Sequence, residues 1–301
     1  MDAILQTLAR ELKRSPEHVQ NVVTLIDEGA TIPFIARYRK ELHGSMDDQL
    51  LRRLADRLQY LRGLAARKEE VRAAVEGQGK LTEDLSAALD AAATLAEVED
   101  LYRPYKQKRR TRATIAREKG LEPLVRLLSA QGPAVDPRQA ALDFLDPDKG
   151  VETAEDALQG ASDIIAERIS DDADIRKRLR ELVWKKGSLV SAAAAKEPED
   201  TVYRLYYAFR SPLNRVQGHQ VLAINRGERE GVLKVSVEME REAALIPVRR
   251  AVLNPGAPAM AFVRAAAEDA YDRLIFPSVE REMRGLLTEQ ADEGAIKMFG
   301  L

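Results

Sequence analysis

The longest regular pattern in the sequence is an apolar stripe that begins at Leu51 and ends at Val75. Its members recur every three or four positions, at Leu51, Leu54, Leu58, Leu61, Leu64, Val71 and Val75. This spacing places them on one face of a helix, and closely spaced glycines end the pattern. We therefore predict one long helix, capped by Ser45, with Asp47 and Asp48 in its first turn and its end at Glu76. At about 1.5 Å per residue its length is ~45 Å, which is typical of a spine on which shorter helices pack.

Shorter amphipathic segments precede and follow this stripe, which predicts a mainly α-helical protein. Two short helices at 2–13 and 16–29 and a third element at 31–41 predict an N-terminal bundle of the helix-turn-helix type. Such corners between helices commonly serve packing only, so the pattern does not predict DNA readout. Later helices are predicted at 82–101, 113–119, 123–128, 137–144, 154–169, 172–184, 260–275 and 279–298, the last capped by Ser278.

One stretch carries a different pattern, which predicts a single β-hairpin. Residues 221–226 and 232–238 are two apolar runs separated by a turn with a glycine at each end. In the second run Val235 and Val237 alternate with polar residues, as on a strand with one buried face. The predicted organisation is therefore a helical domain at 1–200, a hairpin-containing segment at 201–258 and helices at 259–301.

The densest concentration of charge lies in residues 97–120. Eight cations are opposed only by Glu118 in its second part: Arg103, Lys106, Lys108, Arg109, Arg110, Arg112, Arg117 and Lys119. Tyr102 and Tyr105 flank Pro104 at the start of this basic run, where proline turns the chain. Cations suit phosphates and aromatic faces suit bases, so the pattern is compatible with binding a nucleic-acid backbone.

The overall charge balance makes this local run more informative. The chain has 47 Lys and Arg residues against 49 Asp and Glu residues, a formal net charge of −2. The protein as a whole is therefore not drawn to a polyanion, and any attraction must be local. The alternative is a solvated surface run that pairs with Glu97, Glu99 and Asp100, and charge pattern alone favours this alternative.

Composition narrows the class of protein further. Hydrophobic residues make up 45% and charged residues 32% of the 301 positions, which indicates a globular protein with a substantial core. Cysteine is absent, which excludes disulfides, thiolate metal sites and a cysteine nucleophile. No signal peptide is visible, and no apolar run approaches the roughly 20 residues that span a bilayer, so we expect a cytoplasmic protein without membrane contact.

The motifs that carry catalysis or bind cofactors are missing from the sequence. Residues 77–80 read GQGK but lack the earlier glycine and the hydroxyl of a phosphate-binding loop, so we interpret them as a helix-ending turn. The histidines His18, His43 and His219 are dispersed, which predicts no metal site. Nothing assembles a nucleophile, a base and an orienting group. We therefore expect no enzymatic activity, no catalytic residue and no cofactor.

Several of these stretches together resemble the bacterial Tex family of transcription accessory proteins. The resemblance rests on TIPFIARYRKE at 31–41, LYRPYK at 101–106, KRRTRATIAREKGLEP at 108–123 and VLAINRGE at 221–228. It spans nearly the whole chain and implies the N-terminal helical region of a longer protein. In that family a ribonuclease H-like domain, helix-hairpin-helix motifs and a C-terminal OB-fold RNA-binding domain follow, and all three would lie beyond Leu301. The family binds nucleic acid, chiefly through that OB-fold.

The residues and the resemblance together predict a non-catalytic scaffold associated with transcription. It is expected to bind the backbone of RNA or DNA without sequence preference, through the basic run joined by Arg37, Arg39 and Lys40. If about four of these cations meet duplex phosphates, log affinity falls against log salt with a slope of about −3.6. The alternative function is a protein-interaction module whose long helix docks on RNA polymerase or another transcription factor.

Overall fold

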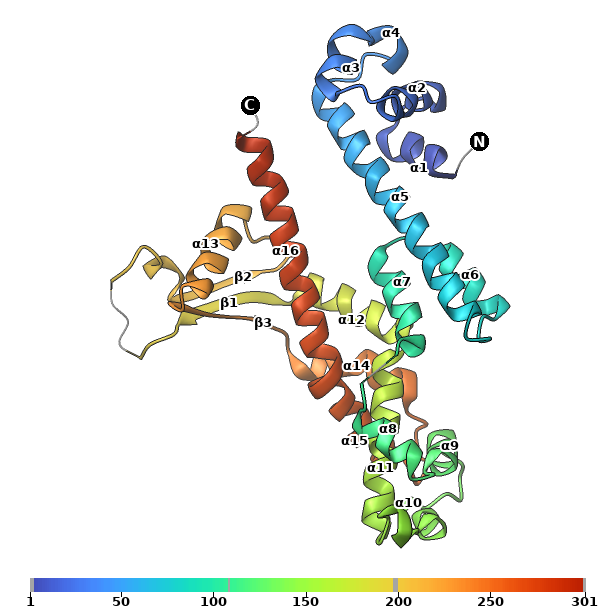
Figure 1. Cartoon of the computed structure of the whole chain (residues 1–301). Helices are drawn as coiled ribbons and strands as arrows, with labels where there is room; N and C mark the ends of the chain where they lie inside the picture. Colours follow the sequence, from blue (N-terminus) through green and yellow to red (C-terminus); the bar gives the residue numbers. More distant parts are fainter. Residues whose placement is uncertain (1–2, 108, 197–199, 300–301) are drawn as a thin grey trace. The chain divides into compact units, whose positions relative to one another are not determined.

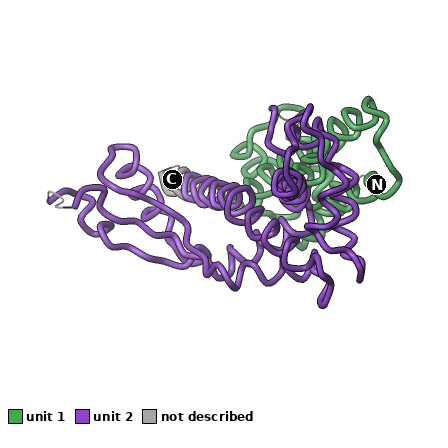
Figure 2. The backbone as a smooth tube through the Cα atoms, turned by 90° about the horizontal axis from the view of Figure 1, so that it is seen from below, with its two compact units in different colours: residues 1–105 green, residues 106–301 purple. Residues whose placement is uncertain are grey.

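The helices that the apolar periodicity predicts dominate the structure (Figure 1). The computed structural model describes residues 3–107, 109–196 and 200–299. It confirms the predicted mainly α fold class. The chain divides into two units, residues 1–105 and residues 106–301 (Figure 2). The domain boundaries predicted at 200 and 258 do not coincide with this division and stay predictions.

Unit 1 is organised along one long helix. Its helices are α1 (Ala3–Leu12), α2 (Pro16–Asp27), α3 (Ile32–Tyr38), α4 (Lys40–His43), α5 (Asp48–Glu76), α6 (Glu83–Ala91) and α7 (Leu95–Tyr102), followed by a 3-10 turn at Arg103–Tyr105. The predicted apolar stripe is buried along α5. Its first part packs against α1, α2 and α3, and its last part packs against α6 and α7. The long helix therefore links two separate apolar clusters.

The start of the long helix differs from the prediction. Asp47 caps α5, because its carboxylate accepts a hydrogen bond from the backbone N–H of Leu50 at 2.8 Å. Ser45, the predicted cap, has a left-handed backbone with φ 58°, and Gly44 before it has φ +60°. Two successive positive φ angles turn the chain away from α4, so the helix can begin only after that turn.

Gly44 is a position where alanine is expected to destabilise unit 1. A Cβ atom at Gly44 would lie 2.3 Å from Nδ1 of His18, and the left-handed backbone strains any L-residue. We expect Gly44→Ala to lower the free energy of unfolding by about 2 kcal/mol, measured by urea denaturation. Gly29→Ala is the matched control, since Gly29 has φ +86° but no neighbour within 4 Å. Equal losses in the two variants would contradict the contact with His18.

Unit 2 combines helices with a small antiparallel sheet. Its helices are α8 (Arg112–Glu118), α9 (Glu122–Ala130), α10 (Pro137–Ala141), α11 (Ala154–Asp171), α12 (Ala173–Lys186), α13 (Gly218–Arg229), α14 (Arg241–Val252), α15 (Met260–Asp269) and α16 (Phe276–Phe299). The strands β1 (Ser188–Ala193), β2 (Ala208–Pro212) and β3 (Leu233–Glu238) lie in the order β2-β1-β3. Helices α13 and α16 pack against each other, and both contact β3 (Figure 1).

The predicted β-hairpin is wrong in its first half. Residues of the first run form α13, and only the second run is a strand, β3. Val221, Ile224 and Gly227 are buried at a spacing of three, which is a helical period. Strand β3 instead pairs with β1, where Val237 lies opposite Leu189. The β-branched residues of the first run favoured a strand, but the spacing of its buried residues is that of a helix.

The last two predicted helices form one continuous helical run. A π-helical segment, Ala270–Ile275, joins α15 to α16. Ser278 therefore lies inside α16 and does not cap it, which corrects the predicted start. Its hydroxyl accepts a hydrogen bond from Nη2 of Arg176 on α12 at 2.8 Å. Serine is typical of helix caps, but here it lies within α16 and provides a hydrogen-bond acceptor for the buried guanidinium of α12.

Candidate nucleic-acid interface

The second half of the basic run folds as α8, a short helix held against α11. Thr111 caps α8, because its hydroxyl accepts a hydrogen bond from the N–H of Thr114 at 3.0 Å. Ala113 and Ala116 are buried, and these small side chains let α8 approach α11 closely. Arg112, between the cap and the buried alanines, is left in solvent. Packing of α8 on α11 thus leaves Arg112 exposed.

Arg117 and Lys119 of the predicted contact residues are tied to neighbouring segments of unit 2. Nη1 of Arg117 donates a hydrogen bond to Oε1 of Glu167 at 2.8 Å, and the hydroxyl of Thr111 donates to Oε2 of the same carboxylate at 2.9 Å. Nζ of Lys119 donates to the backbone carbonyl of Gly150 at 2.8 Å. These contacts hold α8 in place, so both cations contribute to packing in addition to any contact with phosphates.

Arg109 and Arg112 are exposed and form no ion pair with any residue that the structure describes. Between them in sequence, Arg110 pairs with Glu118 at 2.8 Å, and both of these side chains are exposed. An exposed ion pair contributes about 0–1 kcal/mol, so a phosphate can displace Glu118 at little cost. These three arginines are exposed positive charges of the run.

Arg103 and Lys106 stand in sequence on either side of the division between the two units. Arg103 is half-buried in the 3-10 turn that ends unit 1, and Lys106, the first residue of unit 2, is exposed. Lys108 lies outside the described residues.

The two tyrosines at the start of the run are part of the core of unit 1. Tyr102 and Tyr105 are half-buried against the cluster at the end of α5. The guanidinium of Arg67 lies 5.6 Å from the ring centroid of Tyr102, and the backbone carbonyl of Tyr105 accepts a hydrogen bond from Gln78. Packing therefore occupies part of the ring surface that the sequence suggested for bases.

Carboxylates neutralise part of the run, but the partners of Arg110 and Arg117 are not the Glu97, Glu99 and Asp100 that the alternative interpretation named. Arg110 and Arg117 pair with carboxylates of unit 2, namely Glu118, Glu122 and Glu167. Two of the acids that the alternative named form hydrogen bonds within unit 1. Glu97 accepts one from the N–H of Thr94, and Glu99 accepts one from Arg67. The run is thus neither wholly open nor wholly paired.

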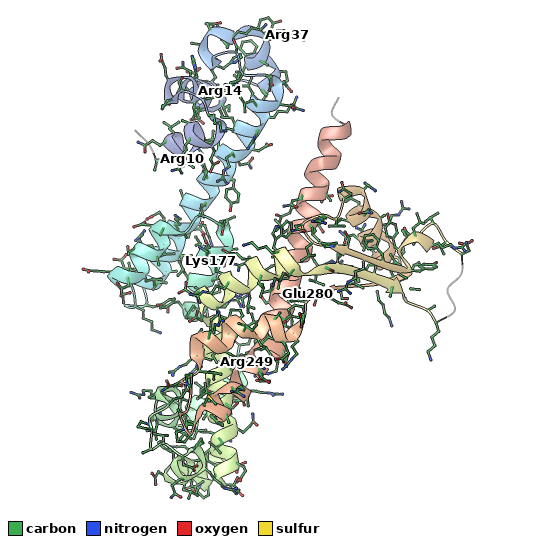
Figure 3. All side chains as sticks on the ribbon, turned by 180° about the vertical axis from the view of Figure 1, so that it is seen from behind. Arg10, Arg14, Arg37, Lys177, Arg249 and Glu280 are labelled. Carbon is green, nitrogen blue, oxygen red and sulfur yellow. The ribbon has the colours of Figure 1, made fainter. Side chains whose placement is uncertain are left out.

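The second predicted group lies in unit 1, at the corner between α3 and α4. Arg37, Arg39 and Lys40 are all exposed there (Figure 3 labels Arg37). The guanidinium of Arg39 lies 5.7 Å from the ring centroid of Phe34. The sequence reasoning missed Phe34 and its neighbour Tyr38 as surface residues, although their spacing of four within the basic segment was an available signal.

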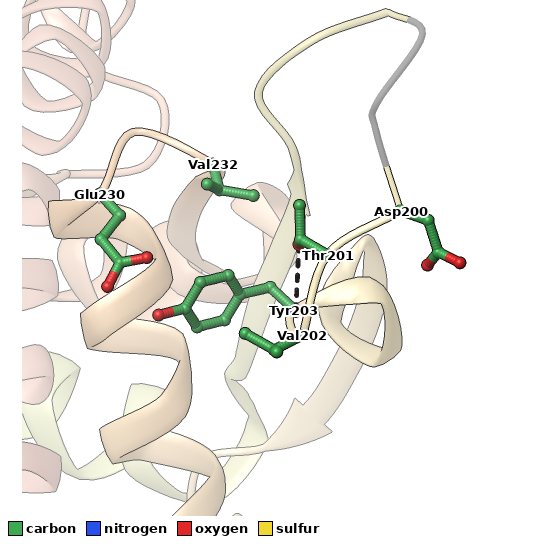
Figure 4. Close-up of a pocket in the computed structure, with 6 residues that line it drawn as sticks. All are labelled: Asp200, Thr201, Val202, Tyr203, Glu230 and Val232. Carbon is green, nitrogen blue, oxygen red and sulfur yellow. Dashed lines mark hydrogen bonds between the residues drawn. The ribbon is translucent and has the colours of Figure 1, made fainter.

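An open hollow of about 660 Å³ lies beside the sheet of unit 2 (Figure 4). It is lined by Asp200, Thr201, Val202, Tyr203, Glu230 and Val232. Burial and a hydrogen bond to Glu230 raise the pKa of Tyr203, while hydrogen bonds from Arg226 and Tyr203 lower the pKa of Glu230. The Tyr203 hydroxyl is thus kept protonated and is a poor proton donor near neutral pH. The Glu230 carboxylate is kept ionised and is a poor proton acceptor. We assign no reaction to this hollow.

The part of the chain that the structure describes has neither a metal-binding cluster nor a membrane-spanning helix. No group of three or more His, Asp or Glu residues there is placed to hold a metal ion. No helix there combines the length and apolarity required to cross a bilayer.

Two segments of the chain match known families. Residues 132–299 match the Tex central region-like family, and residues 2–76 match the Tex-like protein N-terminal domain. The chain belongs to the Tex family. The resemblance found in the sequence motifs is therefore confirmed. The whole basic run lies between the two matched segments, whereas the group around Arg37 lies within the Tex N-terminal segment.

Relatives of this Tex chain occur in bacteria and in animals. It is 43% identical over 298 residues to YdcI of Bacillus subtilis, covering 98% of this chain and 41% of that protein. It is 38% identical over 306 residues to the transcriptional accessory protein Tex of Neisseria gonorrhoeae, covering 98% and 40%. It is 31% identical over 314 residues to S1 RNA-binding domain-containing protein 1 of Homo sapiens, covering 99% and 31%. The chain thus spans between 31% and 41% of the length of these relatives.

Proposed function

We propose that this chain is a non-catalytic scaffold of a transcription accessory protein whose exposed cations bind the phosphate backbone of nucleic acid. The observation that carries the proposal is the solvent exposure of Arg109 and Arg112 without an ion pair to any described residue. The names of the relatives add support, since one is a transcriptional accessory protein and another has an S1 RNA-binding domain. Contacts to phosphates carry no sequence information, so binding should be independent of sequence.

Charge reversal at Arg109 and Arg112 tests the proposal. Each phosphate contact contributes about −0.9 to the slope of log affinity against log salt for a duplex. The double variant Arg109→Glu/Arg112→Glu should therefore bind more weakly and with a slope less steep by about 1.8. Fluorescence anisotropy with a labelled duplex DNA, repeated across a salt series, measures both quantities.

A matched control changes the same net charge elsewhere in unit 2. Arg250 and Arg264 are exposed and form no ion pair within the residues described. The double variant Arg250→Glu/Arg264→Glu should keep the slope of the unaltered protein. An unchanged slope and affinity in the Arg109→Glu/Arg112→Glu variant would overturn the proposed interface.

The second candidate function is docking on a protein such as RNA polymerase. One observation favours it: Val202 and Leu205, between β1 and β2, are apolar side chains that are 85% and 83% exposed. Exposed apolar residues close together are characteristic of protein interaction sites. Capture of RNA polymerase by this chain from a nuclease-treated extract would favour docking over nucleic-acid binding.

A further inference from the structure

We propose that the corner between α3 and α4 stacks unpaired bases of a single-stranded nucleic acid on Phe34 and Tyr38. The inference rests on the proposed function and deepens it, because it names the class of ligand and adds a contact in unit 1. We call this surface the aromatic pad, and it consists of Phe34, Arg37, Tyr38, Arg39 and Lys40.

The two rings of the aromatic pad lie together in solvent. Helix α3 buries Ile35, while Phe34 and Tyr38, four residues apart, share a more exposed side. Their exposed fractions are 42% and 59%, their ring centroids are 5.3 Å apart, and their planes are tilted by 44°. Neighbouring aromatic faces that remain in water are a platform on which bases can stack.

The helices on both sides of the corner are packed, since α3 contacts α5 and α4 contacts α2. The side-chain amide of Asn21 on α2 donates a hydrogen bond to the backbone carbonyl of Leu42 at 3.1 Å. The N–H of Met46 donates to Nδ1 of His43, which is buried, at 2.9 Å. Because these contacts order the corner beforehand, little conformational entropy is lost when a ligand binds.

The charges of the pad suit a phosphate backbone. Arg39 lies over Phe34, and Arg37 and Lys40 are exposed. None of these three cations forms an ion pair with a described residue. Rings for bases beside cations for phosphates are the combination that binds single strands. A duplex hides its base faces within its own stack, so the two rings have nothing to stack on there.

The test compares leucine variants of the full chain with a variant that keeps the ring. Leucine retains apolar surface but removes the aromatic face, so Phe34→Leu and Tyr38→Leu should each weaken binding of a labelled single-stranded oligonucleotide by about 5- to 150-fold. Tyr38→Phe should bind like the unaltered protein. Duplex affinity should stay the same in all three variants, and urea denaturation should show that each remains folded.

The possible outcomes separate this inference from the proposed function. If both leucine variants bind the single strand normally while Arg109→Glu/Arg112→Glu loses duplex binding, the aromatic pad is rejected and the proposed function stands. If the unaltered protein binds neither strand form, both fail. If polyglutamate binds as tightly as the oligonucleotide and equally to the leucine variants, the pad serves an acidic protein and the inference is overturned.

Discussion

Replacing Glu282 by leucine is expected to destabilise unit 2 by about 3 kcal/mol, because a buried positive charge loses a carboxylate that pairs with it. That charge belongs to Arg176 of α12, whose side chain is fully buried. Nη2 of Arg176 donates to Oε1 of Glu282 at 2.8 Å, and Nε of Arg180 donates to Oε2 at 2.9 Å. One carboxylate of α16 thus holds two guanidinium groups of α12.

Urea denaturation near neutral pH measures this loss, and two variants control it. Glu289 is an exposed residue of the same helix, so Glu289→Leu should change the free energy of unfolding by less than about 0.5 kcal/mol. Removing the fully buried guanidinium as well, as in Arg176→Met/Glu282→Leu, should recover part of the stability, because only the partly exposed Arg180 then loses a carboxylate. Equal effects of Glu282→Leu and Glu289→Leu would contradict a structural role for the pair.

The carboxylate of Glu282 also makes the loss of stability in Glu282→Leu depend on pH. Burial raises the pKa of Glu282, but the charges and hydrogen bonds of Arg180 and Arg176 outweigh burial and bring the pKa below its ordinary value of about 4.5. A group with a lowered pKa in the folded state stabilises the protein fully above its ordinary pKa. That contribution is lost as the pH falls through the folded-state value. The difference between Glu282→Leu and the unaltered protein should therefore shrink in acid.

How much of the fold the sequence predicts depends on how local each element is. The stripe of α5 was found because a helix repeats its contacts every three or four residues within one segment. Strand β1 was missed because its partners are distant in the chain: Val190 lies opposite Arg210 on one side and Ser236 on the other. Short strands of this kind are stabilised by cross-strand pairs, which no single segment displays.

The candidate site shows the same limit. The concentration of cations was visible in the sequence, but the partner of Arg117 was not, because Glu167 lies 50 positions away on α11. The packing of α8, and not the charge density of the sequence, therefore determines which arginines stay in solvent. The exposure of Phe34 and Tyr38 likewise depends on which side of α3 the bundle buries.

Valine at Gly160 is the other change with a large expected effect, and it bears directly on the interface. A Cβ atom at this position of α11 would lie 2.3 Å from Cδ1 of Leu121 and 3.2 Å from Cβ of Ala116 on α8. Both neighbours are buried, so the added atoms must push α8 and the start of α9 outward. Overpacking of this kind costs about 1–3 kcal/mol, and we expect Gly160→Val to fall near the upper end, measured by urea denaturation.

A glycine of α16 provides the control for Gly160→Val. Gly285 has no neighbouring atom within 4 Å of an added Cβ, so Gly285→Val should change stability by less than about 0.5 kcal/mol. The valine side chain at Gly160 would clash with α8. The amides of Arg112–Glu118 should therefore also exchange hydrogen faster in Gly160→Val than in Gly285→Val. Normal stability of Gly160→Val with unchanged exchange would mean that α8 is not held by this close approach. The arginines would then lack the fixed platform on which the proposed interface depends.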